Sequence, residues 1–169
     1  MALPRKLKFF NLFHEGESYL GQVNEVTLPK LTRKMEDWQG GGMNAPIKTD
    51  QGMEALTLEF TCGGIMVDVF KQFGITQHDG VKLRFAGSYQ RDDGSNTSSV
   101  EVFVRGRHSS IDPGSAKQGE GSEFKVTSEL SYYKLVVDNE TLVEIDIINM
   151  IEIVNGVDRL EEHRKTLGI

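Results

Sequence analysis

Short runs of alternating hydrophobic and polar residues dominate the chain, and this alternation is typical of strands with one buried face. In the segment 53–60, Leu56, Leu58 and Phe60 fall on one face and polar residues lie between them. Strands are also expected in six other apolar-rich runs, at 9–13, 19–28, 81–90, 99–107, 124–137 and 142–147. Turn-forming residues such as Asp92–Asn96 separate these runs, so successive strands are expected to pair as hairpins, the first through 15–18.

Two segments have helical rather than alternating spacing. The apolar stripe of the first consists of Met66, Val69, Phe70 and Phe73. Gly74 can end this helix in a left-handed conformation. A second short helix is expected within 156–167, because Asp158 and Glu161 have the spacing of a capping box and basic residues follow in the last turn.

Many strands and few helices predict a mainly β fold with minor α, an antiparallel β-barrel or sandwich with a flanking helix. The segment 29–52 is the exception, because it contains Trp38, three consecutive glycines and no sustained period. A connection of about 20 residues in a compact domain is usually functional or disordered. We expect a long extended loop here, within a single domain spanning 1–169.

Composition narrows the possible functions. A chain of 169 residues has the size of one domain, and its net charge of −6 argues against dedicated DNA binding. The single cysteine, Cys62, cannot form an internal disulfide, which is typical of a reducing compartment. No apolar run has the length of a signal peptide core or a membrane span. We therefore expect a soluble protein, made in the cytoplasm, without membrane anchoring.

The residue types that carry catalysis occur singly. The four histidines are scattered, so neither a metal site nor a cofactor is expected. Cys62 precedes a helix but has no base at motif spacing, and Gly40–Gly42 matches no phosphate-binding pattern. The sequence thus predicts no enzyme. The basic cluster of Lys30, Arg33 and Lys34 is expected to contact an acidic protein surface or to be solvated.

Several sequence words, in order and across almost the whole chain, point to one family. They are Leu28–Leu31, Gly41–Met43 with Ala45–Pro46, Arg84–Arg91, Arg105–Arg107, Ile111–Asp112 with Gly114, Lys117–Glu120, Tyr133–Leu135, Val143–Asp146, Asn149–Ile151 and Val154–Leu160. With these words the chain resembles the major tail tube proteins of contractile-tailed temperate phages, the FII family, which also includes the tube subunits of R-type pyocins.

The resemblance implies a structural protein that assembles into hexameric rings, which stack into a hollow tube inside a contractile sheath. Strands of neighbouring subunits would join into one inner sheet, and the segment 29–52 would reach the adjacent ring. Subunit and inter-ring contacts are expected from Arg5, Leu28, Pro29, Lys30, Leu31, Arg33, Lys34, Gly41, Gly42, Met43, Ala45, Pro46 and Asp158. The expected protein partners are the sheath, baseplate, tail-terminator and tape-measure proteins.

The net charge suggests how the lumen of such a tube would interact with DNA. Six copies would carry about −36, and an acidic lumen would repel phosphates so that DNA slides without sequence-specific binding. Glu59, Glu101 and Glu129, on the polar faces of strands, are the lumen candidates. The protein is then expected in the tail of the virion, after assembly in the host cytoplasm.

Three alternatives remain open at this point. The same tube would serve a DNA-free, phage-tail-like bacteriocin. A monomeric β-barrel could bind a ligand through a loop containing Trp38, and a hydrolase could use Cys62. A stable monomer at high concentration would favour the binding module.

Overall fold

The computed structural model describes all 169 residues and confirms a mainly β, antiparallel fold with two short helices. The strands are β1 (Lys6–His14), β2 (Glu17–Ser18), β3 (Val23–Thr27), β4 (Arg33–Trp38), β5 (Ile47–Met53), β6 (Leu56–Cys62), β7 (Val81–Gln90), β8 (Ser98–Asp112), β9 (Phe124–Val137), β10 (Glu140–Asp146), β11 (Ile151–Val154) and β12 (Val157–Asp158). The helices are α1 (Val67–Lys71) and α2 (Glu161–Leu167), and neither is long and apolar enough to cross a membrane.

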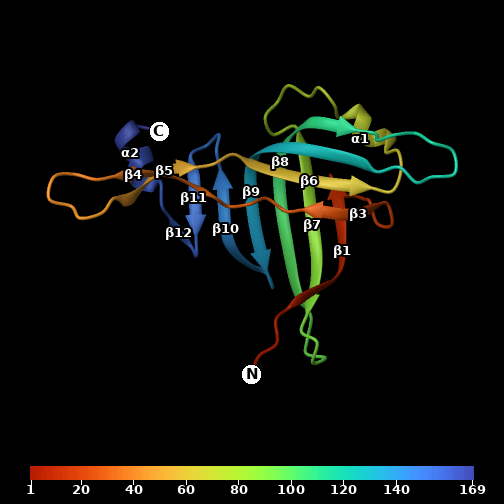
Figure 1. Ribbon diagram of the computed structural model, residues 1–169, viewed down its shortest axis with the longest axis horizontal. Helices are drawn as coiled ribbons and strands as arrows, with labels where there is room; N and C mark the ends of the chain where they lie inside the picture. Colours follow the sequence, from red (N-terminus) through yellow and green to blue (C-terminus); the bar gives the residue numbers. More distant parts are fainter.

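Ten of the twelve strands form one sheet, along the path β12-β11-β10-β9-β8-β7-β1-β2. The long strand β9 has two partners on one side, because its first half pairs with β6 and its second half with β10. Strand β3 then pairs with β6, so that β3 and β6 lie across β7 and β8 in Figure 1. The sheet thereby folds over itself and encloses the core.

The alternation in the sequence decides which side chains fill that core. Leu56, Leu58 and Phe60 are buried as expected, and Val102 and Val104 of β8 face them across the barrel interior. The sheet bends where the register of β8 against β9 shifts at Gly106. A Cβ at this glycine would lie 2.1 Å from the Glu129 carbonyl oxygen, so no side chain fits at the bend.

The segment 29–52 is largely ordered as a hairpin. Strands β4 and β5 pair with each other as a separate two-stranded sheet, in which Trp38 faces Ile47. Figure 1 shows this hairpin projecting from one end of the long axis, beside α2 and the C-terminus. At the opposite end lie α1 and the loop between β8 and β9.

The first expected hairpin is wrong in its pairing. The strand over 9–13 exists as part of β1, but its hairpin partner β2 is only Glu17–Ser18, and the main partner of β1 is β7. The segment 19–28 supplies β3, whose partner is β6. The pairing of β1 with β2 ends just before Tyr19, whose side chain is buried in the core.

Both helices are shorter than expected. Met66, just before α1, and Val69 within it are buried, whereas Phe70 and Phe73 of the same expected stripe are 43% and 60% exposed. Gly74 does adopt a positive φ of 84° after the helix.

At the C-terminus, Asp158 forms no capping box, because it lies in β12 and α2 begins three residues later. The preceding strands β11 and β12 were not expected from the sequence.

Candidate assembly surfaces

Arg33 anchors the hairpin to the main sheet. Its Nε lies 2.8 Å from an oxygen of Asp50 across the hairpin, and its Nη1 lies 2.5 Å from an oxygen of Glu152 on β11. The hydrogen bond from Arg33, followed by one from the Gly52 amide, holds the pKa of the Asp50 carboxyl below its usual range. Arg33 is therefore bound within its own chain, whereas it was expected to contact another subunit or to be solvated.

The tip of the hairpin is apolar and exposed. Trp38 and Ile47 are 60% and 55% exposed, and the sulfur of Met43 accepts a hydrogen bond from the Gly40 amide beneath the turn. Gly42 has a positive φ of 83°, which favours glycine at this position. An isolated two-stranded hairpin is only marginally stable in water, so a further surface is needed to cover these side chains.

The structure places most of the expected contact residues along this hairpin. Lys30, Leu31, Lys34, Gly41, Gly42, Ala45 and Pro46 are exposed, Met43 and Leu28 are half-buried, and Pro29 is buried. The exposed residues form a continuous projection that is free to touch another molecule.

Arg5 and Asp158 lie outside the hairpin; Arg5 is exposed, whereas Asp158 is bound by another residue of its own chain. Arg5 is exposed and precedes β1. Asp158 accepts hydrogen bonds from Arg164 of α2, which lower the pKa of this carboxyl, and Arg164 also donates to the Met150 carbonyl at 2.8 Å. Asp158 thus joins α2 to the sheet within one chain.

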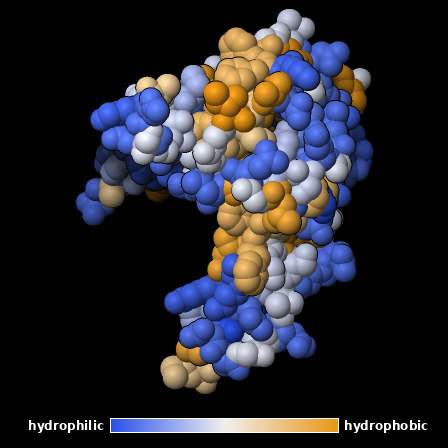
Figure 2. Space-filling view, turned by 90° about the vertical axis from the view of Figure 1, so that its right-hand side faces the viewer, coloured by the Kyte–Doolittle hydropathy of each residue, from blue (hydrophilic) through white to orange (hydrophobic).

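The end of the molecule opposite the hairpin carries a second apolar surface. Ile65, Val67, Phe70 and Phe73, in and around α1, are 43–69% exposed and are called the α1 patch below. Figure 2 views this end of the molecule and shows apolar side chains gathered in its upper part. The helical stripe expected from the sequence included Phe70 and Phe73 of this patch but not Ile65 or Val67.

A polar face covers the part of the sheet formed by β3, β6, the first half of β9 and the end of β8. Thr57 of β6 donates a 3.1 Å hydrogen bond to Glu129 of β9, and Lys125 lies 3.4 Å from Glu59. Two of the lumen candidates thus lie on one face. Glu101 lies six residues along β8 from Arg107, the partner of Glu129, and is 3.4 Å from Arg84 instead.

Two edges beside this polar face have no partner strand. Strand β3 pairs only with β6, and β8 has β9 alone as its partner beyond Gly106, where its pairing with β7 ends. Unpaired strand edges readily accept a strand from another chain. A third edge, the outer side of β1 from Lys6 to Asn11, is also bare.

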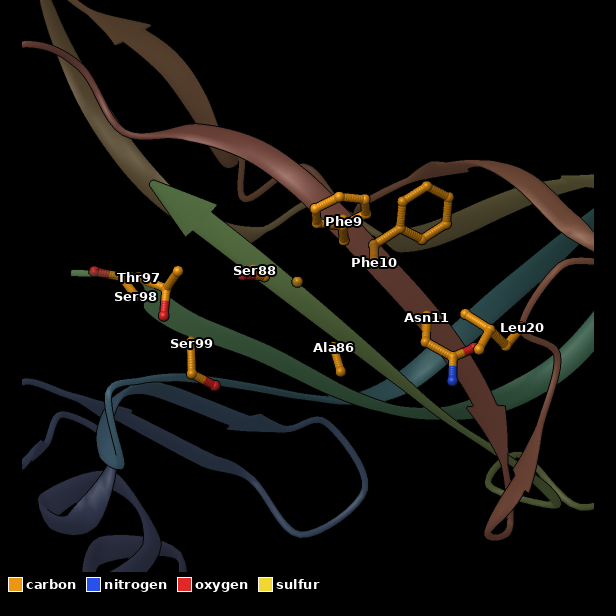
Figure 3. A pocket seen from close by; sticks show the side chains of 10 residues that line it. Phe9, Phe10, Asn11, Leu20, Ala86, Ser88, Thr97, Ser98 and Ser99 are labelled. Carbon is orange, nitrogen blue, oxygen red and sulfur yellow. The ribbon is translucent and has the colours of Figure 1, made fainter. Parts of the chain in front are cut away.

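A shallow hollow of about 350 Å³ lies next to the bare part of β1. Figure 3 shows that Phe9, Phe10 and Asn11 of β1 and Ala86 and Ser88 of β7 contribute to its wall. Phe9 is 79% exposed at its rim, and small side chains form much of the rest of the lining.

A polar network is buried beneath α1. His108 of β8 donates from Nε2 to the Gln72 side-chain oxygen at 2.7 Å, and its Nδ1 lies 2.8 Å from the Ser128 hydroxyl. The Gln72 amide in turn donates to Nδ1 of His14 at 3.2 Å. Burial lowers the pKa of His108 from 6.5 to about 4, so the ring is neutral and connects α1 to the barrel.

Cys62 lies in the core without access to solvent. Burial raises the pKa of its thiol from 9.0 to about 11, which disfavours the reactive thiolate. This environment argues against a hydrolase that uses Cys62.

Solved structures with a similar fold come from contractile injection systems. The sheath/tube terminator of the PVC extracellular contractile injection system aligns with 78% of this chain and 96% of its own, at a TM-score of 0.59 and 13% identity. The tube-terminating cap of the anti-feeding prophage aligns with 80% and 93%, at a TM-score of 0.58 and 12% identity. At such identities the likeness concerns the fold alone.

Sequence relatives are much closer. The tail tube protein of Escherichia phage P2 is 51% identical over 172 residues, covering all of both chains. The major tail tube protein of Serratia phage KSP20 is 41% identical over 153 residues, which cover 89% of this chain and 88% of that protein. These relatives are structural tail proteins rather than enzymes. The model of the phage tail tube protein FII family matches residues 4–168, and the chain belongs to this family.

Proposed function

We propose that this chain assembles into hexameric rings, which stack to form the inner tube of a contractile phage tail and conduct DNA into the host. The tail tube function agrees with the names of both phage relatives. The observation that carries the ring is the pair of bare edges, on β3 and on the end of β8, at opposite sides of one polar face.

The strand directions allow β8 of one copy to pair with β3 of the next. Pairing is antiparallel from β3 to β6, from β6 to β9 and from β9 to β8, so β3 and β8 run in opposite directions. When β8 of one copy meets β3 of the next, the new pair is also antiparallel. Repetition around a ring covers both of these edges, which removes the hazard that they present in an isolated chain.

The polar face then lines the lumen. Its threonines and carboxylates, including Glu59 and Glu129, suit contact with water, and carboxylates disfavour adhesion of phosphates. Glu101 remains a weaker candidate, since it lies on another part of the sheet and beside Arg84.

We also propose that the tube contacts the sheath on its outer surface, the baseplate and tail-terminator proteins at its ends, and the tape-measure protein inside before DNA enters. Tail tube proteins of phages are virion components, and assembly of this one would take place in the host cytoplasm. The sheath contact has support from a structural neighbour solved as a sheath–tube complex, at a TM-score of 0.58.

The first test is negative-stain electron microscopy of the purified chain, paired with light scattering over a concentration series. We expect six-fold rings or hollow tubes, at high concentration or once baseplate components are added as a template. A chain that stays monomeric with the template present would contradict the proposal and favour a monomeric binding module.

The lumen assignment has a separate test. The double variant Glu59→Gln and Glu129→Gln is expected to assemble normally but to slow DNA ejection, because phosphates would meet less repulsion along the wall. Glu101→Gln, at the weaker candidate, is expected to slow DNA ejection less than the double variant does. Equal ejection rates for the double variant and the unchanged phage would refute a lumen position for both glutamates.

A further inference from the structure

We infer that a basic hollow over β7, β8 and β9 binds carboxylate side chains of the sheath protein. The inference rests on the proposed function and deepens it by naming the surface and the chemistry of the sheath contact. The hollow has a volume of about 330 Å³, and one acidic side chain, Glu15, lies in its wall. Its four basic side chains, called the outer cations below, are Lys82, Arg84, Arg105 and Lys134.

The strand register places the outer cations on the side of the barrel away from the polar face. Along β7, Lys82 and Arg84 alternate with Val81, Leu83 and Phe85, whose side chains are buried in the core. The outer cations of β8 and β9 alternate with core residues in the same way. If the polar face lines the lumen, the hollow therefore opens on the outside of the tube. None of its lining residues belongs to the hairpin or to the α1 patch.

Aromatic rings lie beneath three of the outer cations, in the pairs Arg84–Phe13, Arg105–Tyr132 and Lys134–Phe103, with 4.1, 4.0 and 5.8 Å between cation and ring centre. A guanidinium that lies flat on a ring can still donate from the N–H groups at its edge. Such a side chain is already held in position, so it loses less conformational freedom when a carboxylate binds. Glu144, the strand partner of Lys134, accepts a 3.1 Å hydrogen bond from the Tyr132 hydroxyl and forms no ion pair with the lysine.

The chain leaves most of this positive charge without a counter-charge. Arg84 lies 3.4 Å from Glu101, but the other three outer cations form no ion pair within the chain. Lys82 and Arg105 are also direct partners across β7 and β8, and like charges directly opposite each other destabilise a sheet. Carboxylates of another protein would remove this repulsion. Because the whole chain has a net charge of −6, an acidic partner would be attracted to this hollow in particular.

Sheath binding to assembled tubes tests the inference. Tubes grown on a baseplate template, from the unchanged chain or from the double variant Arg105→Gln and Lys134→Gln, would be mixed with the sheath protein of the same phage and sedimented. We expect the variant tubes to form at the normal yield and to bind at least tenfold less sheath. The control is the double variant Lys8→Gln and Lys165→Gln, which removes the same charge from exposed sites outside the hollow and should bind sheath normally.

A single substitution separates sheath binding from folding. Lys82→Gln removes the repulsion with Arg105, so we expect the melting temperature of the monomer to rise by about 1–2 °C. Sheath binding should nevertheless fall at least twofold, because one of the outer cations is lost. Unchanged sheath binding by tubes of Lys82→Gln would contradict the inference.

The remaining outcomes separate this inference from the proposed function. Normal tubes of the Arg105→Gln and Lys134→Gln variant that bind sheath as the unchanged tubes do, or unchanged tubes that bind no sheath, would overturn the inference but leave the tube intact. A chain that forms no rings even with a baseplate template would overturn the proposed function and the inference together. A labelled DNA duplex that binds the unchanged chain but not this variant would assign the hollow to phosphates and overturn the sheath contact.

Discussion

His108 shows how one buried side chain makes the stability of the fold depend on pH. In the folded chain its pKa is about 4, whereas the ordinary value is 6.5, so the unfolded chain takes up a proton first. The stabilising effect is complete above pH 6.5 and is lost as the pH falls towards 4. The carboxylates with lowered pKa, such as Asp50 and Asp158, lose their contribution only at still lower pH.

We therefore predict that the free energy of unfolding falls by about 3 kcal/mol between pH 7 and pH 4. Urea unfolding followed by circular dichroism at several pH values in this range measures the change. The variant His108→Gln cannot take up this proton, so its unfolding free energy should fall clearly less over the same range. Equal slopes for the two proteins would show that another group titrates.

Gly106 is a second position at which one added atom would change the stability of the fold. An added Cβ would lie 2.1 Å from the Glu129 carbonyl oxygen, in a part of the sheet where both neighbouring backbones are fixed by pairing. Gly106→Ala is predicted to destabilise the fold by about 2–3 kcal/mol, because the strands must move apart. Thermal unfolding checks this, with Gly121→Ala as the control, since nothing lies within 4 Å of that site. A similar small loss in both variants would refute the steric explanation.

At the scale of elements, the hairpin is held by one arginine at its base. Replacement of Glu152 by Gln removes one of the two carboxylates bound by Arg33 and leaves the other in place. The pair is partly exposed, so we expect a loss of up to about 1 kcal/mol. The effect should appear locally, as faster opening of β4 and β5.

Hydrogen exchange measured by mass spectrometry tests this expectation. Peptides from the hairpin should exchange roughly fivefold faster in Glu152→Gln, while peptides from β8 and β9 stay unchanged. The matched control is Asp37→Asn, which removes an exposed ion pair with Lys48 further along the same hairpin. Equal effects of the two variants would show that Arg33 does not anchor the hairpin.

The sequence predicted best those strands whose hydrophobic pattern can be recognised without knowing which strand they pair with. The sequence places β7 and β9 with their observed bounds, since one face of each packs against the core. The strand expected over 53–60 is only partly right, because β6 spans Leu56–Cys62 and Met53 ends β5. The partner of β3 was missed because pairing with β6 depends on the whole fold. The spacing of Asp158 and Glu161 suggested a capping box, but pairing of β12 with β11 removed Asp158 from the helix.

The assembly surfaces were predictable to a lesser degree. The segment 29–52 stood out because it lacked a period, and it proved to contain the hairpin. The stripe that contains Phe70 and Phe73 was expected from its helical spacing, but such a stripe looks the same whether its partner is in the same chain or in another. The separation of Glu101 from Glu59 and Glu129 required the register of the strands.

At the scale of the whole molecule, stability and assembly use different parts of the chain. The buried hydrophobic residues lie in the barrel, whereas the hairpin tip contributes none of them. We predict that replacing residues 39–46 by a two-residue Asn-Gly turn leaves the monomer's melting temperature within a few degrees. Such a turn can join Trp38 to Ile47, because these residues already face each other.

The shortened chain should nevertheless fail to form tubes, since its projection no longer reaches a neighbour. Circular dichroism reports the melting temperature, and electron microscopy counts the tubes. A full-length hairpin with the substitution Lys48→Gln serves as the control and should assemble. Normal tubes from the shortened chain would show that the tip is dispensable.

The unlike ends of this molecule also have a consequence for growth. If the subunits stack head to tail as proposed, the stack has a direction, because the hairpins project at only one of its two ends. The protein that starts such a stack must therefore have a different shape from the protein that stops it. Elongation at one end leaves the other free to remain bound to its starting platform, so length can be controlled at a single growing tip.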